Sequence, residues 1–176
     1  MKNKVIQVPL SVRGIEKAIR ELDEYKRWLK RCSENLLSKL ADRGYQIASA
    51  KFQNVTYDGE NDVKVSVDDR GKSVKAVVAV GSSVLFIEFG TGIVYPDVHP
   101  EAAANGMNRG EYGKGHGKNR TWYYYGEPGS NGTVVRDNTV KGPLIATHGN
   151  PANMAMYNTV KELKSILPQL VKESFV

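Results

Sequence analysis

Glu88 is the side chain of this sequence that is best placed to act as an acid or a base. It stands near the end of an apolar segment, residues 84–89, and burial favours the protonated form of a carboxyl group, which general-acid catalysis uses. No second carboxylate accompanies Glu88 at a defined spacing, and glycoside hydrolysis needs two. We therefore expect a structural role, in which the Glu88 carboxylate accepts backbone N–H groups from the turn at residues 90–92.

The other reactive residue types do not form a catalytic or metal-binding pattern. The three histidines, His99, His116 and His148, fall outside the predicted helices, and each is followed by proline or glycine. Zinc and iron sites use histidines at helical or hairpin spacing with a carboxylate close by. Residues 90–92 lack the Lys-Ser/Thr pair of a phosphate-binding loop and indicate a tight turn. A small hydrolase that uses Glu88 with one histidine is the weakest functional interpretation, and we expect neither a cofactor nor a metal.

Four consecutive aromatic residues, Trp122, Tyr123, Tyr124 and Tyr125, follow Arg120. Side chains alternate along a strand, so two of the four rings must point away from any core. Trp, Tyr and Arg are enriched where protein subunits bind one another, and aromatic rings also stack on nucleic-acid bases. We favour a neighbouring protein subunit over nucleic acid as the partner of these rings.

The composition is that of an ordinary globular protein. The 176 residues are 40% hydrophobic and 25% charged, which fits one domain with an extension. Cys32 is the one cysteine, lies on the apolar side of a predicted helix and excludes an internal disulfide. The net charge of +6 is uneven, because residues 1–51 are strongly basic and residues 52–104 are acidic. No apolar run is long enough to cross a bilayer, and no secretory signal is recognised, so we expect synthesis in a cytoplasm.

The N-terminal region predicts helix. Apolar residues recur at steps of three and four, and Ser11 is a candidate N-cap. The pattern fits one long amphipathic helix or two helices with a break near residues 31–33 or at Gly44, where glycine is a natural helix end. The apolar stripe consists of Ile15, Ile19, Leu22, Tyr25, Leu29, Cys32, Leu36 and Leu40.

The remaining sequence predicts a small sheet, a long insertion and a closing helix. Residues 63–67 and 74–80 alternate as the strands of a hairpin, and residues 84–89 are expected to form a third strand. Glycines dominate residues 93–150, where residues 121–125 form a short strand with 133–135 and 144–147 as possible partners. A final helix opens after residue 150 and contains Pro168, which should kink it.

These elements define an α+β fold. We expect a small antiparallel sheet of three to four strands packed on long N-terminal helices and a C-terminal helix, with a long insertion loop. The single domain then comprises a helical region (1–54), the antiparallel sheet (61–90), the extended insertion (91–150) and the C-terminal helix (151–175).

The order of these pieces resembles the tail-completion, or minor tail component, family of long-tailed bacteriophages, which joins heads to tails. The resemblance spans residues 11–175 and depends on residues 84–92, the four aromatic residues, and residues 147–152 with the start of the last helix. The insertion at residues 93–147 is longer than in the shorter family members.

The resemblance implies a non-enzymatic virion protein of the phage neck or tail, made in the host bacterial cytoplasm. Such a protein forms a homo-oligomeric ring, expected to be a hexamer, between the head-side connector or stopper and the tail terminator or tail-tube protein. It lies near packaged DNA and contacts no membrane. The expected ring interface comprises Trp122, Tyr123, Tyr124, Tyr125, Arg120 and His148, and the structural turn comprises Glu88, Phe89, Gly90, Thr91 and Gly92.

A second interpretation comes from a different class of protein. The basic predicted helices and the aromatic residues 122–125 together have the composition of a nucleic-acid-binding module. In that case binding to DNA of any sequence should weaken steeply with salt, because phosphate contacts release counterions.

Overall fold

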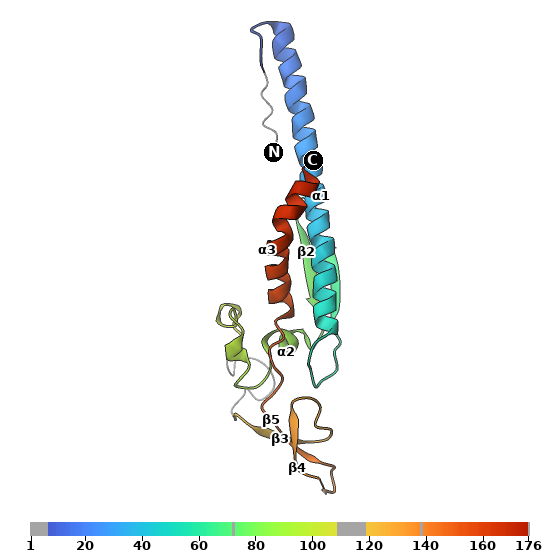
Figure 1. The fold of residues 1–176 in the computed structure, drawn as a ribbon, viewed down its shortest axis with the longest axis vertical. Helices are drawn as coiled ribbons and strands as arrows, with labels where there is room; N and C mark the ends of the chain where they lie inside the picture. The colour runs from blue at the N-terminus through green and yellow to red at the C-terminus, as the bar shows by residue number, and fades with distance from the viewer. Residues whose placement is uncertain (1–6, 72, 109–118, 138, 176) are drawn as a thin grey trace.

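The computed structural model describes residues 7–71, 73–108, 119–137 and 139–175. It confirms the α+β class: two long helices, a short helix and two small antiparallel sheets form an elongated molecule (Figure 1). The free end of α1 lies at one extreme of the long axis, and the strands β3, β4 and β5 lie at the other.

Helix α1 (Val12–Gln53) is one continuous helix of 42 residues. At 1.5 Å per residue it is about 63 Å long. Ser11 is the N-cap, as predicted, and its hydroxyl accepts the Gly14 N–H at 3.1 Å. Of the two alternatives predicted from the sequence, the single long helix is confirmed and the pair of N-terminal helices is wrong, because neither residues 31–33 nor Gly44 interrupts α1.

Gly44, which was a possible helix end in the sequence analysis, lies inside α1 and allows close packing. A Cβ at this position would lie 2.8 Å from Val77 Cγ2 and 3.2 Å from Leu163 Cδ1. Glycine therefore lets a strand and a second helix approach α1 at the same level, at the cost of some helix propensity.

Strands β1 (Lys64–Asp69) and β2 (Lys75–Val80) form the predicted antiparallel hairpin. Val65 pairs with Ala79 and Val67 with Val77, so these four side chains share one face of the hairpin. That face packs on the C-terminal half of α1, where Val65 and Ala79 contact the core.

The third strand predicted at residues 84–89 is wrong, because these residues form the short helix α2 (Val84–Phe89). A short apolar run fits a buried strand or a buried helical turn equally well. The carboxylate of Asp62 favours the helix, because it accepts the backbone N–H groups of Ser82 and Ser83 at 2.7 and 2.9 Å. These bonds anchor the chain where the helix begins, and the sheet of residues 61–90 has two strands.

The region 91–150 is not an extended loop in its described part. It contains the 3₁₀ turns η1 (Pro96–Val98) and η2 (Ala103–Asn105), and then the strands β3 (Trp122–Tyr125), β4 (Gly132–Arg136) and β5 (Leu144–Thr147). The strand order is β3-β5-β4, all antiparallel. Of the two partners suggested for residues 121–125, residues 144–147 pair with them as β5, whereas β4, which contains residues 133–135, pairs with β5 and not with β3. These strands form a second sheet and do not extend the hairpin.

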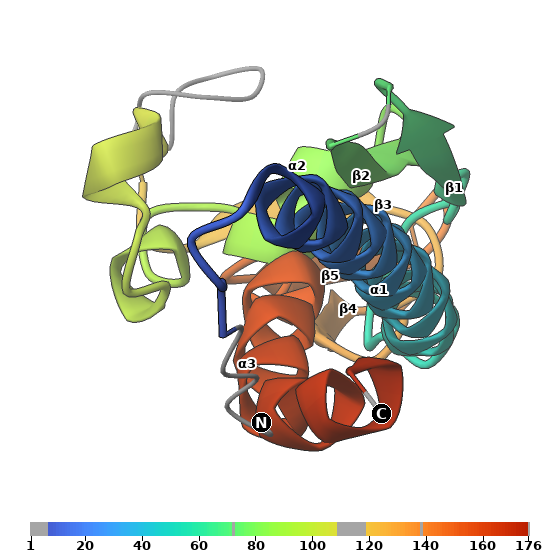
Figure 2. The same ribbon diagram turned by 90° about the horizontal axis from the view of Figure 1, so that it is seen from above.

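Helix α3 (Ala155–Ser174) begins four residues later than expected. Met154, the residue before it, has a left-handed backbone with φ of 53°. Pro168 lies inside the helix, and the last turns of α3 run at an angle to the rest (Figure 2), as expected for a proline in this position.

The core lies where the three α-helices meet the β1–β2 hairpin. Phe52 at the end of α1, Ile87 in α2 and Ala155 at the start of α3 are buried together. Half-buried residues of β1 and β2 pack around them. The C-terminal half of α1 thus has α3 on one side and the hairpin on another (Figure 2), whereas its N-terminal half extends beyond both (Figure 1).

Candidate interaction site

Glu88 caps the start of α3. Its side chain is buried, and Oε2 accepts the Met156 N–H at 2.7 Å while Oε1 accepts the Tyr157 N–H at 2.9 Å. These donors belong to the first turn of the helix, whose N–H groups have no partners within the helix itself. A carboxylate also suits the positive end of the helix dipole. The structural role predicted for Glu88 fits this geometry, but the partners predicted in the turn at residues 90–92 are wrong.

His99 completes this buried cluster. The Glu101 N–H donates to Nδ1 at 3.1 Å, so the proton is assigned to Nε2, which donates to Glu88 Oε1 at 3.2 Å. The imidazole also contacts the rings of Phe89 and Tyr157, with centroids 4.4 and 5.4 Å away. The cluster therefore joins α2, the turn after η1 and the start of α3.

The glycine turn at residues 90–92 lies against the segment that leads into α3. The Thr91 N–H donates to the Asn150 carbonyl at 2.9 Å, and the Asn150 N–H donates to Thr91 Oγ1 at 2.6 Å. Gly92 has φ of +84°, and a Cβ there would lie 2.5 Å from the His148 carbonyl oxygen. Only glycine fits this close approach without displacing its neighbours.

Asp58 attaches the second sheet to the rest of the molecule. It lies after α1, and its carboxylate accepts the N–H groups of Ser130 and Asn131 at 2.6 and 2.8 Å. The Asp58 N–H donates to Asn150 Oδ1 at 2.8 Å, and Asn131 Nδ2 donates to the same oxygen at 2.9 Å. The bonds of Asp58 link residues more than seventy positions apart and position the sheet at the far end of the molecule.

The aromatic strand β3 alternates as predicted. Tyr123 and Tyr125 are 60% and 49% exposed, whereas Trp122 and Tyr124 are half-buried. Tyr123 pairs with Ala146 and Tyr125 with Leu144 across β5, so their side chains share the outer face of the sheet. Two large rings on an open sheet face are typical of a surface that meets a partner.

The environment of these rings differs from one to the next. Burial, and then the nearby Asp58 carboxylate, raise the pKa of Tyr124, whose hydroxyl donates to the Glu127 carbonyl at 2.9 Å. The Lys141 ammonium lies over the exposed Tyr125 ring, 5.7 Å from its centroid. The inner rings thus belong to the fold, and the outer rings remain accessible.

Arg120 and His148 lie together at the start of β3. His148 is exposed, and its Nδ1 is 2.9 Å from the Arg120 carbonyl oxygen and 3.1 Å from Thr121 Oγ1. Both predicted interface residues therefore lie beside the aromatic strand. His116, the third histidine, falls outside the described residues. Within the described ranges, no three His, Cys, Asp or Glu side chains come together in a way that could hold a metal ion.

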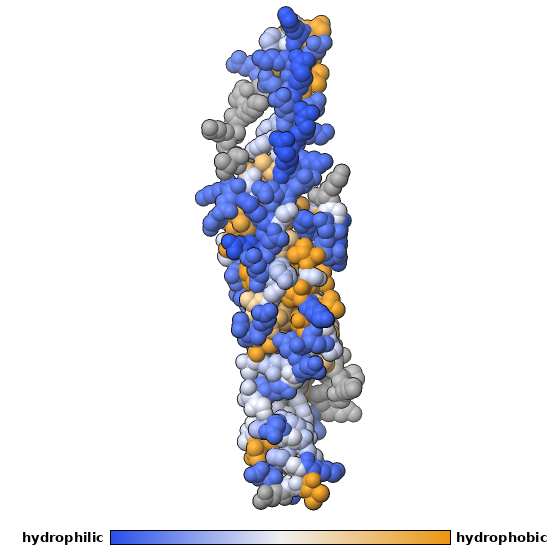
Figure 3. All heavy atoms as spheres, turned by 90° about the vertical axis from the view of Figure 1, so that its right-hand side faces the viewer, coloured by the Kyte–Doolittle hydropathy of each residue, from blue (hydrophilic) through white to orange (hydrophobic). Residues whose placement is uncertain are grey.

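The free half of α1 is a second exposed surface, which the sequence did not distinguish from core. The side chains of Ile15, Ile19, Leu22, Tyr25 and Leu29 are all exposed, although they continue the stripe that is covered lower on the helix. Figure 3 shows apolar side chains among charged ones at this end of the molecule. Periodicity identifies an apolar stripe but cannot show how far α3 and the hairpin reach along it.

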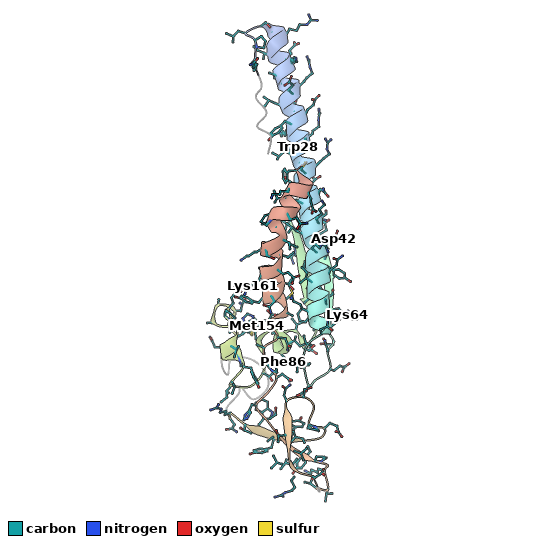
Figure 4. All side chains as sticks on the ribbon, in the orientation of Figure 1. Trp28, Asp42, Lys64, Phe86, Met154 and Lys161 are labelled. Atoms are coloured by element: carbon teal, nitrogen blue, oxygen red, sulfur yellow. The ribbon has the colours of Figure 1, made fainter. Side chains whose placement is uncertain are left out.

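The basic residues of α1 lie far from the aromatic strand. Lys26, Arg27, Lys30 and Arg31 are exposed around Trp28, toward one end of the molecule, and β3 lies at the other (Figures 1 and 4). A nucleic-acid site that combines both features on one surface would need more than one copy of the chain. The nucleic-acid interpretation stays a prediction.

Comparison with known proteins finds no family model, no curated protein and no solved structure that matches this chain. Among the described helices, none is both long and apolar enough to cross a membrane.

Proposed function

We propose that this chain is a structural subunit of a bacteriophage neck or tail. It forms a homo-oligomeric ring that joins the head-side connector to the tail terminator or tail tube. The observation that carries this proposal is that two unlike sets of exposed apolar and aromatic side chains, on β3 and on the N-terminal half of α1, lie at opposite ends of one elongated subunit. A joining protein needs such a layout, because it must hold its own copies and also contact other components of the virion.

The sheet end supplies the first surface. Tyr123 and Tyr125 project from β3, and Arg120 and His148 lie beside them. This sheet is attached to the rest of the molecule through Asp58, so the rings keep a defined position. Aromatic rings held rigidly at a surface are the residues that contribute most to protein–protein binding.

The α1 end supplies the second surface and much of the positive charge. The exposed apolar stripe suits contact between subunits, and the exposed basic residues of positions 26–31 suit proximity to packaged DNA. In a ring, the positive charge of every copy adds around the central channel.

Deletion of the gene from the phage genome that carries it tests the proposal. Electron microscopy of the lysate should show filled heads separate from finished tails, and the wild-type gene in trans should restore joined particles. A Tyr123→Ala/Tyr125→Ala variant should restore them poorly, whereas Val140→Ala, which alters an exposed apolar residue of a nearby loop, should restore them fully. Joined, infectious particles in the absence of the protein would overturn the proposal.

A further inference from the structure

The free half of α1 has a repeat that the fold of a single chain leaves unused. Ile15, Leu22 and Leu29 are exposed and follow one another at intervals of seven residues, and half-buried Leu36 continues the series. A seven-residue apolar repeat is typical of a helix that packs along another helix in a coiled coil. Ile19 and Tyr25 widen the stripe on either side. Ala18, on the same side, is already buried and adds no exposed area.

The helix that covers the lower part of α1 ends before it reaches this repeat. Phe175, at the C-terminal end of α3, contacts Trp28 with ring centroids 6.1 Å apart. Figure 4 shows Trp28 at the level where α3 ends. The sixteen residues of α1 on the N-terminal side of Trp28 extend about 24 Å, and they lack the tertiary packing of an apolar face that supplies most helical stability in proteins. A second helix along the stripe would supply the missing burial.

We propose that residues 15–29 of α1 pack in parallel against the same residues of a second copy of this chain. The charges beside the stripe favour this partner and this direction. Glu21 and Lys26 flank the stripe on opposite sides and are five residues apart. In a parallel pair this spacing places Glu21 of one copy beside Lys26 of the other, twice in each pair. An antiparallel pair aligns neither residue with an opposite charge.

The α1 contact specifies one subunit contact of the proposed virion protein. It rests on the proposed function only where it is placed in a ring. Copies related by a rotation axis all point the same way along that axis, so a parallel α1 contact along the axis is compatible with cyclic symmetry, whereas an antiparallel contact along it is not. Arg27 and Arg31 lie away from the stripe on the helical wheel, so these basic residues of paired copies do not meet at the centre of the contact.

Sedimentation equilibrium of the full chain, over a range of concentrations, tests the contact. The Ile15→Ser/Leu22→Ser variant should weaken self-association by at least about 100-fold, because burial of four large apolar side chains is lost from each pair. The matched control is Val160→Ser on α3, since Val160 is 46% exposed and Ile15 48%. This control should change the dissociation constant by less than about twofold. A wild type of constant monomeric mass, or a double variant that associates as well as the control, would overturn the proposal.

Charge reversal tests whether the two α1 helices run parallel or antiparallel. Glu21→Lys and Lys26→Glu should each weaken association by about tenfold, and the combination of the two should restore it, because two attractive pairs are re-formed. A combined variant as weak as the single variants would overturn the parallel arrangement. Failure of the proposed neck role is a different outcome from failure of this contact. It would appear as joined phage particles when the protein is absent, whatever mass the purified chain has in sedimentation.

Discussion

The two halves of α1 have similar apolar periodicity but different surroundings. In the C-terminal half, Phe52 is only 2% exposed because the hairpin, α2 and α3 converge on it. In the N-terminal half, Ile19 is 54% exposed. An amphipathic stripe therefore marks apolar contact of a helix without distinguishing contact within its own chain from contact with another chain.

The largest expected effect contrasts these two residues directly. Phe52→Ala should lower the free energy of unfolding by about 3–5 kcal/mol, because it leaves a cavity in the core. Ile19→Ala should lower it by less than about 0.5 kcal/mol in dilute solution, where the residue has no partner to lose. Urea unfolding of the two variants measures both values. Similar losses for the two variants would show that the halves are equally buried.

The covered half depends on α3, and Glu88 fixes where α3 starts. Glu88→Gln should destabilise the fold by about 1–3 kcal/mol, because an amide NH₂ replaces one of the two oxygens that accept N–H groups. Hydrogen exchange should accelerate first in α3 and in the part of α1 beneath it. Glu101→Gln, at an exposed carboxylate in the next turn, is the control and should leave exchange unchanged.

A valine introduced into each half of α1 should change the stability by different amounts. Gly44→Val should destabilise by about 1–3 kcal/mol, since its Cβ would lie 2.8 Å from Val77 Cγ2 in a packed core. Arg20→Val, on the exposed half, should cost no more than the difference in helix propensity, about 0.5 kcal/mol. Thermal unfolding of both variants provides the test. A stabilised Gly44→Val would mean that the hairpin does not pack closely on α1.

The smallest effect concerns pH and the hairpin that covers the other side of α1. Hydrogen bonds from the Ser83 side chain and from Ser82 hold the pKa of Asp62 well below its ordinary value. The stabilisation is therefore complete above the unfolded pKa of about 3.9 and is lost as the pH falls through and below it. Asp62→Asn should lower the melting temperature at pH 7, and the difference from wild type should shrink at pH 3. Glu60→Gln should show no such convergence.

Local patterns in the sequence predicted much of the fold. Ser11, the stripe on α1, the alternation in β1 and the four aromatics of β3 each depend on neighbouring residues, and the structure confirms the elements that they predicted. Helix α2 was missed because a run of six residues, five of them apolar, fits a strand or a helix equally well, and its anchor Asp62 lies more than twenty residues away.

The candidate sites show the same limit. Tyr123 and Tyr125 could be expected to point outward from alternation alone. The backbone N–H groups that Glu88 accepts are in α3, almost seventy residues further along the chain, and no local pattern identifies them. The exposure of Ile15 and Leu22 depends on where α3 ends, which is a property of the tertiary fold.

Hydrogen exchange of the two halves of α1, measured at several concentrations of the full chain, tests the central claim most directly. If residues 12–29 are a subunit contact, their amides should exchange rapidly at low concentration and become protected as copies associate. The amides of residues 41–53 should be protected throughout, because their cover belongs to the same chain. Protection of residues 12–29 that does not change with concentration would contradict the account.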